Sequence, residues 1–162
     1  MKQLILVSHG SFAEGLKTSL AMFAGDKIDQ VTAVGLKDGA NVDDLATEFS
    51  KRLEENNIDS ETELIVLADI IGGSPLTTVC NVLEERGLLA SSIVFGGMNL
   101  PMALNALVMK DMLPNDEFIT MILTEAKNAV QEFKTDISDE EDEHRYPDPH
   151  DLPVPSGRSA VL

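Results

Sequence analysis

The stretch ILVSHGSF, residues 5–12, decides the fold class because a short aliphatic run stops at a serine, a histidine and a glycine. A run of this length between polar flanks is too short for a helix, so we predict a buried strand over residues 3–8. Gly10 then predicts a turn with an unusual backbone conformation, or the close approach of a ligand. His9 is therefore expected where a strand stops and a loop begins, which is where α/β proteins carry their chemistry. A loop histidine without a role is the alternative at this point.

Strand patterns alternate with helix patterns along residues 1–134. Short apolar runs predict three further strands at VTAVGL (31–36), LIVLA (64–68) and SIVFGG (92–97). Apolar residues at helical spacing predict helices over residues 12–24, 42–53, 75–86, 100–109 and 116–127. Because strands that alternate with helices form a parallel sheet covered on both faces, we predict an α/β fold around a parallel sheet of four strands.

Residues with known capping preferences mark the helix ends. Gly25 is expected to end the first helix, and Asn41 to cap the second. Pro75 is expected at the first position of the third helix, and Gly87 is expected to stop it. The apolar face of the first helix is expected to comprise Phe12, Leu16, Leu20 and Phe23.

The segment NAVQEFK, residues 128–134, follows the last helix with a weak alternation of apolar and polar residues. Such a segment fits a strand at a sheet edge, either of its own chain or of a neighbouring copy. A continuation of the last helix fits the same pattern.

Composition narrows the class of protein. The 162 residues suit one domain, and the core must be aliphatic because the chain has no Trp and one Tyr. A net charge of −16 argues against a nucleic-acid partner, which needs a basic surface. The lone Cys80 cannot form an internal disulfide, which favours a reducing compartment. No apolar run approaches the roughly 18 residues of a membrane span, and the N-terminus lacks a signal-peptide pattern. We therefore expect a cytoplasmic protein.

Residues 135–162 differ from the rest of the chain. They hold eight acidic residues against two arginines, together with the proline-containing run YPDPHDLPVP. This composition cannot supply a packed core, so we predict a disordered acidic tail after a domain at residues 1–134. His144 and His150 lie in this tail, where solvated histidines are expected rather than metal ligands.

Asp69 follows the third strand as His9 follows the first. The carboxyl ends of parallel strands lie at one edge of the sheet, so this carboxylate and this imidazole can meet. An aspartate that accepts the Nδ1 proton fixes the tautomer and leaves Nε2 free as a nucleophile. A turn-forming role for Asp69 is the alternative.

The sequence GGSP, residues 72–75, opens the third helix. Exposed backbone N–H groups, the Ser74 hydroxyl and the positive end of the helix dipole together suit a phosphoryl group. We therefore predict that Gly72, Gly73 and Ser74 bind phosphoryl oxygens. Tight-turn glycines and a simple N-cap serine are the structural alternatives.

A further glycine pair follows the fourth strand in FGGMNLPM, residues 95–102. We predict that Gly10, Gly97, Met98 and Asn99 line the groove around His9. A purely structural turn, with Asn99 as a helix cap, is the alternative.

The sequence lacks the residues that other common catalytic and binding sites require. A Walker loop needs a lysine after its glycines, no G-x-S-x-G elbow occurs, and no cysteine–histidine cluster could hold zinc. We therefore expect no metal and no cofactor. A histidine nucleophile beside an anion site without a nucleotide site indicates a phosphoryl carrier.

Three motifs give the chain a resemblance to a known family. VSHG near the N-terminus, DIIGGSP after the third strand and GGMNLPM after the fourth resemble the IIA component of the mannose-type sugar phosphotransferase system. The resemblance covers residues 1–134 in motif order and spacing.

This resemblance implies a phosphotransferase in which His9 accepts a phosphoryl group on Nε2 from phosphorylated HPr and passes it to a histidine of a IIB component. It also implies that Asp69 orients His9 and that Ser74 and nearby amides hold the phosphoryl oxygens. Family members are typically homodimers that exchange a C-terminal strand, which favours a swapped edge strand at residues 130–134. The IIC and IID membrane components would be indirect partners, and they would choose the transported sugar.

The chain departs from the family at some positions. Ile70 and Ile71 stand where some members have polar or aromatic residues, so the rim of the groove is expected to differ. No IIB domain follows, so we expect a free-standing IIA component. A related subunit serves dihydroxyacetone kinase, but its second motif resembles DMGSA rather than DIIGGSP. A regulatory module that binds a partner through the same groove is the alternative from another functional class.

Overall fold

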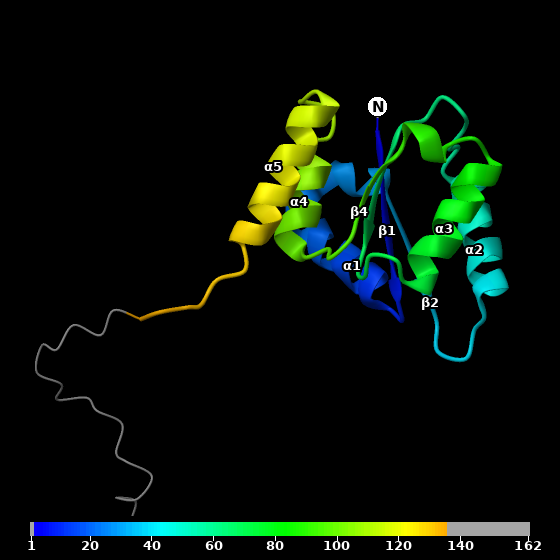
Figure 1. Cartoon of the computed structure of the whole chain (residues 1–162), viewed down its shortest axis with the longest axis horizontal. Coiled ribbons are helices and arrows are strands. Elements are labelled where there is room, and N and C mark those ends of the chain that lie inside the picture. The colour runs from blue at the N-terminus through cyan, green and yellow to red at the C-terminus, as the bar shows by residue number, and fades with distance from the viewer. Residues whose placement is uncertain (1, 136–162) are drawn as a thin grey trace, which may run out of the picture. The chain divides into compact units, whose positions relative to one another are not determined.

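The computed structural model describes residues 2–135, and four parallel strands form a sheet within this range in the order β2-β1-β3-β4 (Figure 1). The strands are β1 (Gln3–His9), β2 (Val31–Leu36), β3 (Leu64–Ala68) and β4 (Ile93–Phe95). β1 pairs with β2 on one side and with β3 on the other, and Val7 lies level with Val34 and Ala68. The predicted four-stranded parallel sheet is confirmed.

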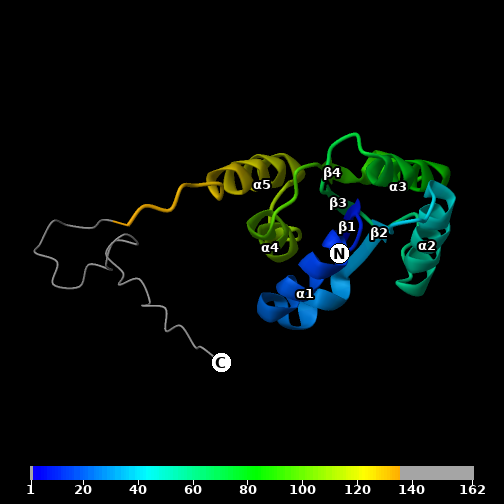
Figure 2. The ribbon, with the colours of Figure 1, turned by 90° about the horizontal axis from the view of Figure 1, so that it is seen from below.

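Helices cover both faces of this sheet (Figure 2). The helices are α1 (Phe12–Ala24), α2 (Val42–Glu55), α3 (Ser74–Glu85), α4 (Leu100–Met109) and α5 (Asn115–Asn128). Core residues of α1, α4 and α5 pack on one face, and those of α2 and α3 pack on the other. Short 3₁₀ segments at Gly25–Gln30 and Leu89–Ser91, which the sequence did not predict, lead into β2 and β4.

The central strand β1 shows why its sequence is a continuous apolar run. Leu4 and Leu6 belong to the core under α1, α4 and α5, whereas Ile5 and Val7 belong to the core under α2 and α3. Successive side chains of a strand point to opposite faces, so a strand buried on both faces is apolar at every position. The run ends at His9, where β1 reaches the carboxyl edge of the sheet.

Most predicted helix ends are confirmed. Asn41 caps α2 in a capping box, because its side chain accepts from the Asp44 N–H while the Asp44 carboxylate accepts from the Asn41 N–H. Gly25 follows the last residue of α1. Pro75 is the second residue of α3 rather than the first, because Gly73 is the N-cap and Ser74 begins the helix.

Two members of the predicted apolar face of α1 are solvent exposed. Leu16 and Leu20 are buried, but Phe12 is 48% exposed and Phe23 is 63% exposed. These phenylalanines lie in the first and last turns of α1, so helical spacing alone did not bring them over the sheet.

Residues 130–135 form no helix and no strand. The helix α5 ends at Asn128, so the segment neither continues this helix nor adds a strand to the sheet of its own chain. A strand donated to a neighbouring copy remains a prediction. The chain divides into the units Met1–Gln131 and Glu132–Leu162, and the predicted tail, with its two histidines, lies outside the described residues from position 136 onward.

Within residues 2–135, no helix is long and apolar enough to cross a membrane.

Candidate functional site

His9 and Asp69 meet at the carboxyl edge of the sheet. β1 ends at His9, and Asp69 follows the last residue of the adjacent strand β3. The His9 Nδ1 atom lies 2.9 Å from Asp69 Oδ2. The predicted meeting of this imidazole and this carboxylate is confirmed.

Three hydrogen bonds hold the Asp69 carboxylate. Oδ2 also accepts from the His9 backbone N–H at 2.8 Å, and Oδ1 accepts from the Ile70 N–H at 2.8 Å. Burial on its own raises the pKa of Asp69, but the hydrogen bonds from the backbone and ring of His9 and from Ile70 outweigh it and hold the pKa below its usual value. Asp69 is therefore a carboxylate at neutral pH.

The state of Asp69 determines which nitrogen of His9 can react. An ionised carboxylate only accepts hydrogen bonds, so His9 Nδ1 must carry a proton. In the neutral ring, Nε2 then presents its lone pair. The His9 side chain is 45% exposed, so a reacting group from solvent or from another protein can reach the ring.

Gly73 provides the space in which the His9 ring lies. A Cβ atom built on Gly73 would be 3.0 Å from His9 Cε1, the ring carbon between Nδ1 and Nε2. The preceding turn is closed by a hydrogen bond from the Gly73 N–H to the Ile70 carbonyl at 3.4 Å, and Gly72 has φ +74° within it. A side chain at either glycine would strain the turn or displace the ring.

The N-terminus of α3 begins beside the same ring. Ser74, the first residue of α3, is exposed, and the N-cap residue, Gly73, has no side chain to cap the N–H groups of the first turn. The first turn of a helix has N–H groups without intrahelical partners and carries a partial positive charge. The contact of Gly73 with His9 Cε1 places this positive end next to the imidazole ring.

The loop after β4 contacts the turn that follows Asp69. A Cβ atom built on Gly96 would lie 2.5 Å from Ile71 Cβ, so the β4–α4 loop packs directly against the turn that follows Asp69. Gly97 is exposed with φ +76°. The Met98 N–H donates to the Ala68 carbonyl at 2.9 Å, which ties this loop to β3.

Met98 does not line the groove as predicted, and half-buried Asn99 makes the capping bond of the structural alternative. The Met98 side chain is only 5% exposed and packs in the core, because an apolar side chain in this loop turns inward toward the helix layer. Asn99 caps α4 by accepting from the Met102 N–H at 2.9 Å, and its amide donates to the Ala126 carbonyl at 3.2 Å. Gly10 keeps its predicted place beside His9, with φ +56° and its N–H bonded to the Leu36 carbonyl at 2.8 Å.

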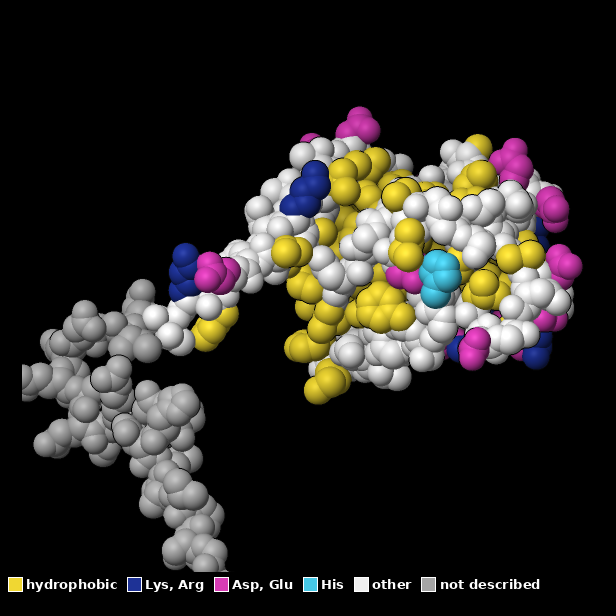
Figure 3. All heavy atoms as spheres, turned by 60° about the horizontal axis from the view of Figure 1, so that its bottom comes forward, with side chains coloured by type: hydrophobic (Ala, Val, Ile, Leu, Met, Phe, Trp, Pro, Cys, Tyr) yellow, Lys and Arg dark blue, Asp and Glu magenta, His cyan; other side chains and the backbone are white. Residues whose placement is uncertain are grey.

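Exposed apolar side chains lie around the histidine. The sequence did not predict this apolar surface. Figure 3 shows the described histidine at the surface among hydrophobic side chains. Phe12, Ile70 and Ile71 are 48%, 56% and 69% exposed; Phe12 begins α1 just after His9, and the two isoleucines follow Asp69 in its loop. We call these three residues the apolar rim. The sequence feature that could have predicted this surface is the pair of isoleucines in the turn between an aspartate and two glycines.

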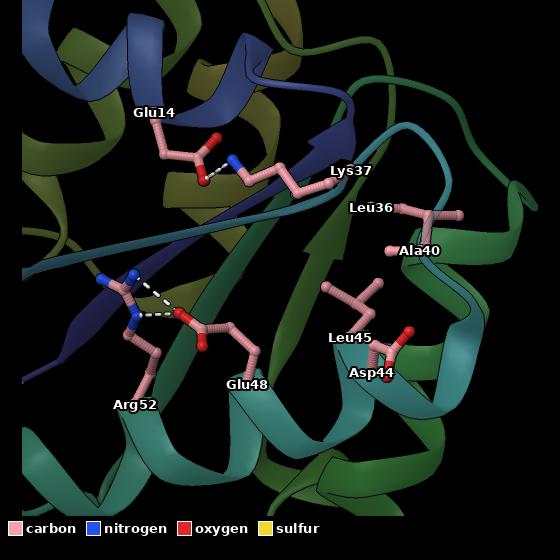
Figure 4. A pocket seen from close by; sticks show the side chains of 9 residues that line it. Glu14, Leu36, Lys37, Ala40, Asp44, Leu45, Glu48 and Arg52 are labelled. Atoms are coloured by element: carbon pink, nitrogen blue, oxygen red, sulfur yellow. Dashed lines mark hydrogen bonds and ion pairs between the residues drawn. The ribbon is translucent and has the colours of Figure 1, made fainter.

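A cleft of about 410 Å³ opens beside β2, between α1 and α2 (Figure 4). The charged side chains that line it are largely paired, Lys37 with Glu14 and Arg52 with Glu48. No group of three or more metal-binding side chains converges anywhere in residues 2–135.

The fold and the His9–Asp69 pair define a class of α/β protein with an exposed imidazole held by a carboxylate at the carboxyl edge of its sheet. The family model of the fructose IIA component of the phosphotransferase system (EIIA-man) matches residues 3–123, so the chain belongs to this family. It is a IIA component of the mannose family, a phosphotransferase that acts as a phosphocarrier in sugar uptake.

Individual relatives agree with this assignment. The fructose-specific EIIA component of Bacillus subtilis (strain 168) is 25% identical over 131 residues, which are 81% of this chain and 86% of that protein. The mannose/sorbose-specific IIA subunit from Enterococcus faecalis is 26% identical with a TM-score of 0.68, covering 83% of this chain and 97% of that one. A IIA protein associated with a fucose utilization operon in Streptococcus pneumoniae is 28% identical with a TM-score of 0.65, covering 81% and 92%.

The lowered pKa of Asp69 predicts how stability depends on pH. A carboxyl group whose pKa is lower in the folded state stabilises the fold above its unfolded pKa, and this contribution is lost as the pH falls through the folded pKa. We expect Asp69→Asn to lower the free energy of unfolding at pH 7 by about 1–3 kcal/mol, since it removes hydrogen bonds to a charged group. The deficit relative to wild type should shrink below about pH 4. Urea unfolding at pH 7 and pH 3 measures it, and a deficit equal at both values would contradict this role of the charge.

Proposed function

We propose that the chain accepts a phosphoryl group from phosphorylated HPr on His9 Nε2 and passes it to a histidine of a IIB component in the cytoplasm. The observation that carries this proposal is the 2.9 Å contact of His9 Nδ1 with Asp69 Oδ2 beneath a half-exposed ring. Membership of the family supports HPr and IIB as the protein partners, with IIC and IID as indirect membrane partners.

The proposed transfer needs little from the protein besides orientation and charge. The Nε2 lone pair of His9 attacks the phosphorus, the nitrogen–phosphorus bond of the donor phosphohistidine breaks, and the electron pair of that bond returns to the donor ring. The His9 ring gains positive charge as the new bond forms, and the Asp69 carboxylate stabilises it through the Nδ1 proton. Transfer to IIB follows the same steps in reverse.

Gly72, Gly73 and Ser74 are the groups we propose for the phosphoryl oxygens. Ser74 is exposed at the start of α3, so its hydroxyl can donate to an incoming oxygen. Unpaired N–H groups in the first turn and the positive end of the helix favour the negative charge of the phosphoryl group. Exposed Gly97 completes the neighbouring wall of the proposed groove.

We further propose a homodimer in which residues 130–134 add a strand to the sheet of a second copy. Val130 and Phe133 are 78% and 90% exposed, an unfavourable state for two large apolar side chains in a monomer. β4 lies at the end of the sheet order and offers an edge for pairing.

Rapid-quench transfer from phosphorylated HPr tests the site. We expect no acid-labile phosphate on His9→Ala, and a loss of roughly 10- to 1,000-fold in rate for Asp69→Asn, milder than the 10⁴-fold loss of the corresponding change in the serine-protease triad. The amide that Asp69→Asn introduces would favour the wrong ring tautomer, and the substitution also removes the negative charge.

Asp59→Asn is the matched control, because Asp59 also accepts hydrogen bonds within a turn but lies away from His9. Transfer by Asp69→Asn within about twofold of this control would contradict the role of Asp69. Label that reaches the chain but never moves on to IIB would support the regulatory alternative instead.

The apolar rim should contribute to docking of the protein donor and not to the chemistry. We expect the double variant Ile70→Ser/Ile71→Ser to raise the KM for phosphorylated HPr by about tenfold, because truncating apolar contacts at the centre of an interface weakens binding. Phosphorylation of His9 by phosphoramidate, a donor too small to reach both isoleucines, should stay within about twofold.

The control for this variant is Met112→Ser, which removes an apolar side chain that is 66% exposed in the α4–α5 connection. Equal losses with HPr and with phosphoramidate would show that the double variant disturbs the site rather than a docking surface.

A further inference from the structure

Ser8, the residue before His9, has a buried hydroxyl that the proposed transfer does not use. Its side chain is 0% exposed, and within residues 2–135 the other buried polar or charged residues are Thr32 and Lys110. A hydroxyl is retained in a packed interior when it makes a hydrogen bond, so the partner of Ser8 indicates what it does.

The direction of the Ser8 side chain follows from the alternation along β1. Leu4 and Leu6 face the layer of α1, α4 and α5, so Ser8 faces this layer as well. His9 has the opposite parity and lies against Gly73 at the start of α3. Two consecutive residues of β1 therefore connect the end of the strand to helices on both faces.

Ser8 caps α1 from within the strand. Its Oγ atom accepts from the Ala13 N–H at 2.8 Å. Ser11, the residue that immediately precedes α1, makes no capping hydrogen bond and has φ −99° and ψ 14°. The 8-to-13 hydrogen bond closes the chain into a loop that contains His9, Gly10 and the first residue of α1.

Other contacts hold the remaining sides of this loop. The His9 N–H donates to Asp69, and the Gly10 N–H donates to the Leu36 carbonyl. The Gly10 carbonyl oxygen would lie 2.0 Å from a Cβ atom on Gly35, which is the residue level with Ser8 on β2. The loop is thus fixed to β3 by Asp69, to β2 by Gly10, and to α1 by Ser8.

We infer that Ser8 is a positioning residue for His9. Without its hydroxyl, the Ala13 N–H loses its acceptor, and the first turn of α1 is no longer anchored to the strand that ends in the histidine. The loop can then move, so the imidazole spends less time hydrogen bonded to Asp69 with Nε2 directed outward. A displacement of about 1 Å of a reacting group can cost 10²-fold in rate.

The kinetic part of this inference rests on the proposed phosphoryl transfer, whereas its structural part does not. The variants are Ser8→Ala, which deletes one atom, and Ser8→Thr, which keeps the hydroxyl. Thr32→Val is the matched control, because Thr32 is also a buried hydroxyl of the sheet, bonded to the Asn56 side chain at 3.2 Å and far along β2 from Leu36.

Nuclear magnetic resonance of ¹⁵N-histidine-labelled protein reports the His9 Nδ1 proton directly, without any phosphoryl donor. We expect this signal to be observed in wild type, Ser8→Thr and Thr32→Val, and to be broadened or lost in Ser8→Ala. In rapid-quench transfer, we expect kcat to fall about tenfold in Ser8→Ala with KM within about twofold, and Ser8→Thr to restore it.

A Ser8→Ala protein that loses stability as Thr32→Val does, but keeps the Nδ1 proton signal and the wild-type kcat, would overturn the inference. A wild-type chain that takes no phosphoryl group from HPr would instead refute the proposed function, and the proton signal of the variants would still decide the role of Ser8.

Discussion

The hydrogen bond between the His9 ring and the Asp69 carboxylate is the interaction on which the site depends. It joins the ends of two neighbouring parallel strands, so it exists only because β1 and β3 are adjacent in the sheet. Asp69 accepts from the His9 backbone as well, which fixes both the position of the residue and the orientation of its ring. One carboxylate thereby sets the tautomer, and the tautomer determines which nitrogen can act as the nucleophile.

Close packing of loops at the carboxyl edge keeps this arrangement in place. Gly35 allows the approach of the Gly10 carbonyl, Gly73 leaves space for the His9 ring, and Gly96 admits the turn at Ile71. Gly35 lies near the end of β2, Gly73 in the loop after β3, and Gly96 in the loop after β4. The end of β2 thus contacts the loop after β1, the end of β1 contacts the loop after β3, and the loop after β3 contacts the loop after β4.

Much of this arrangement could be predicted from the sequence, because a parallel sheet constrains where strand ends lie. The strands at 31–36 and 64–68 and the meeting of His9 with Asp69 follow from that constraint. The inward direction of Met98 could not be predicted, since an apolar residue beside glycines suits either a groove or a core. The capping of α1 by Ser8 was hidden because Ser11 stands where a cap is expected. A strand at residues 130–134 depends on a second chain, whose presence no local pattern can establish.

In the mechanism we propose, Asp69 directs the phosphoryl group to Nε2 of His9. Phosphorylated protein labelled with ¹⁵N-histidine tests it directly, because coupling between phosphorus and nitrogen identifies the atom that carries the group. We predict that coupling is observed to Nε2 of His9. Coupling to Nδ1 of His9, or to a histidine other than His9, would contradict the claim.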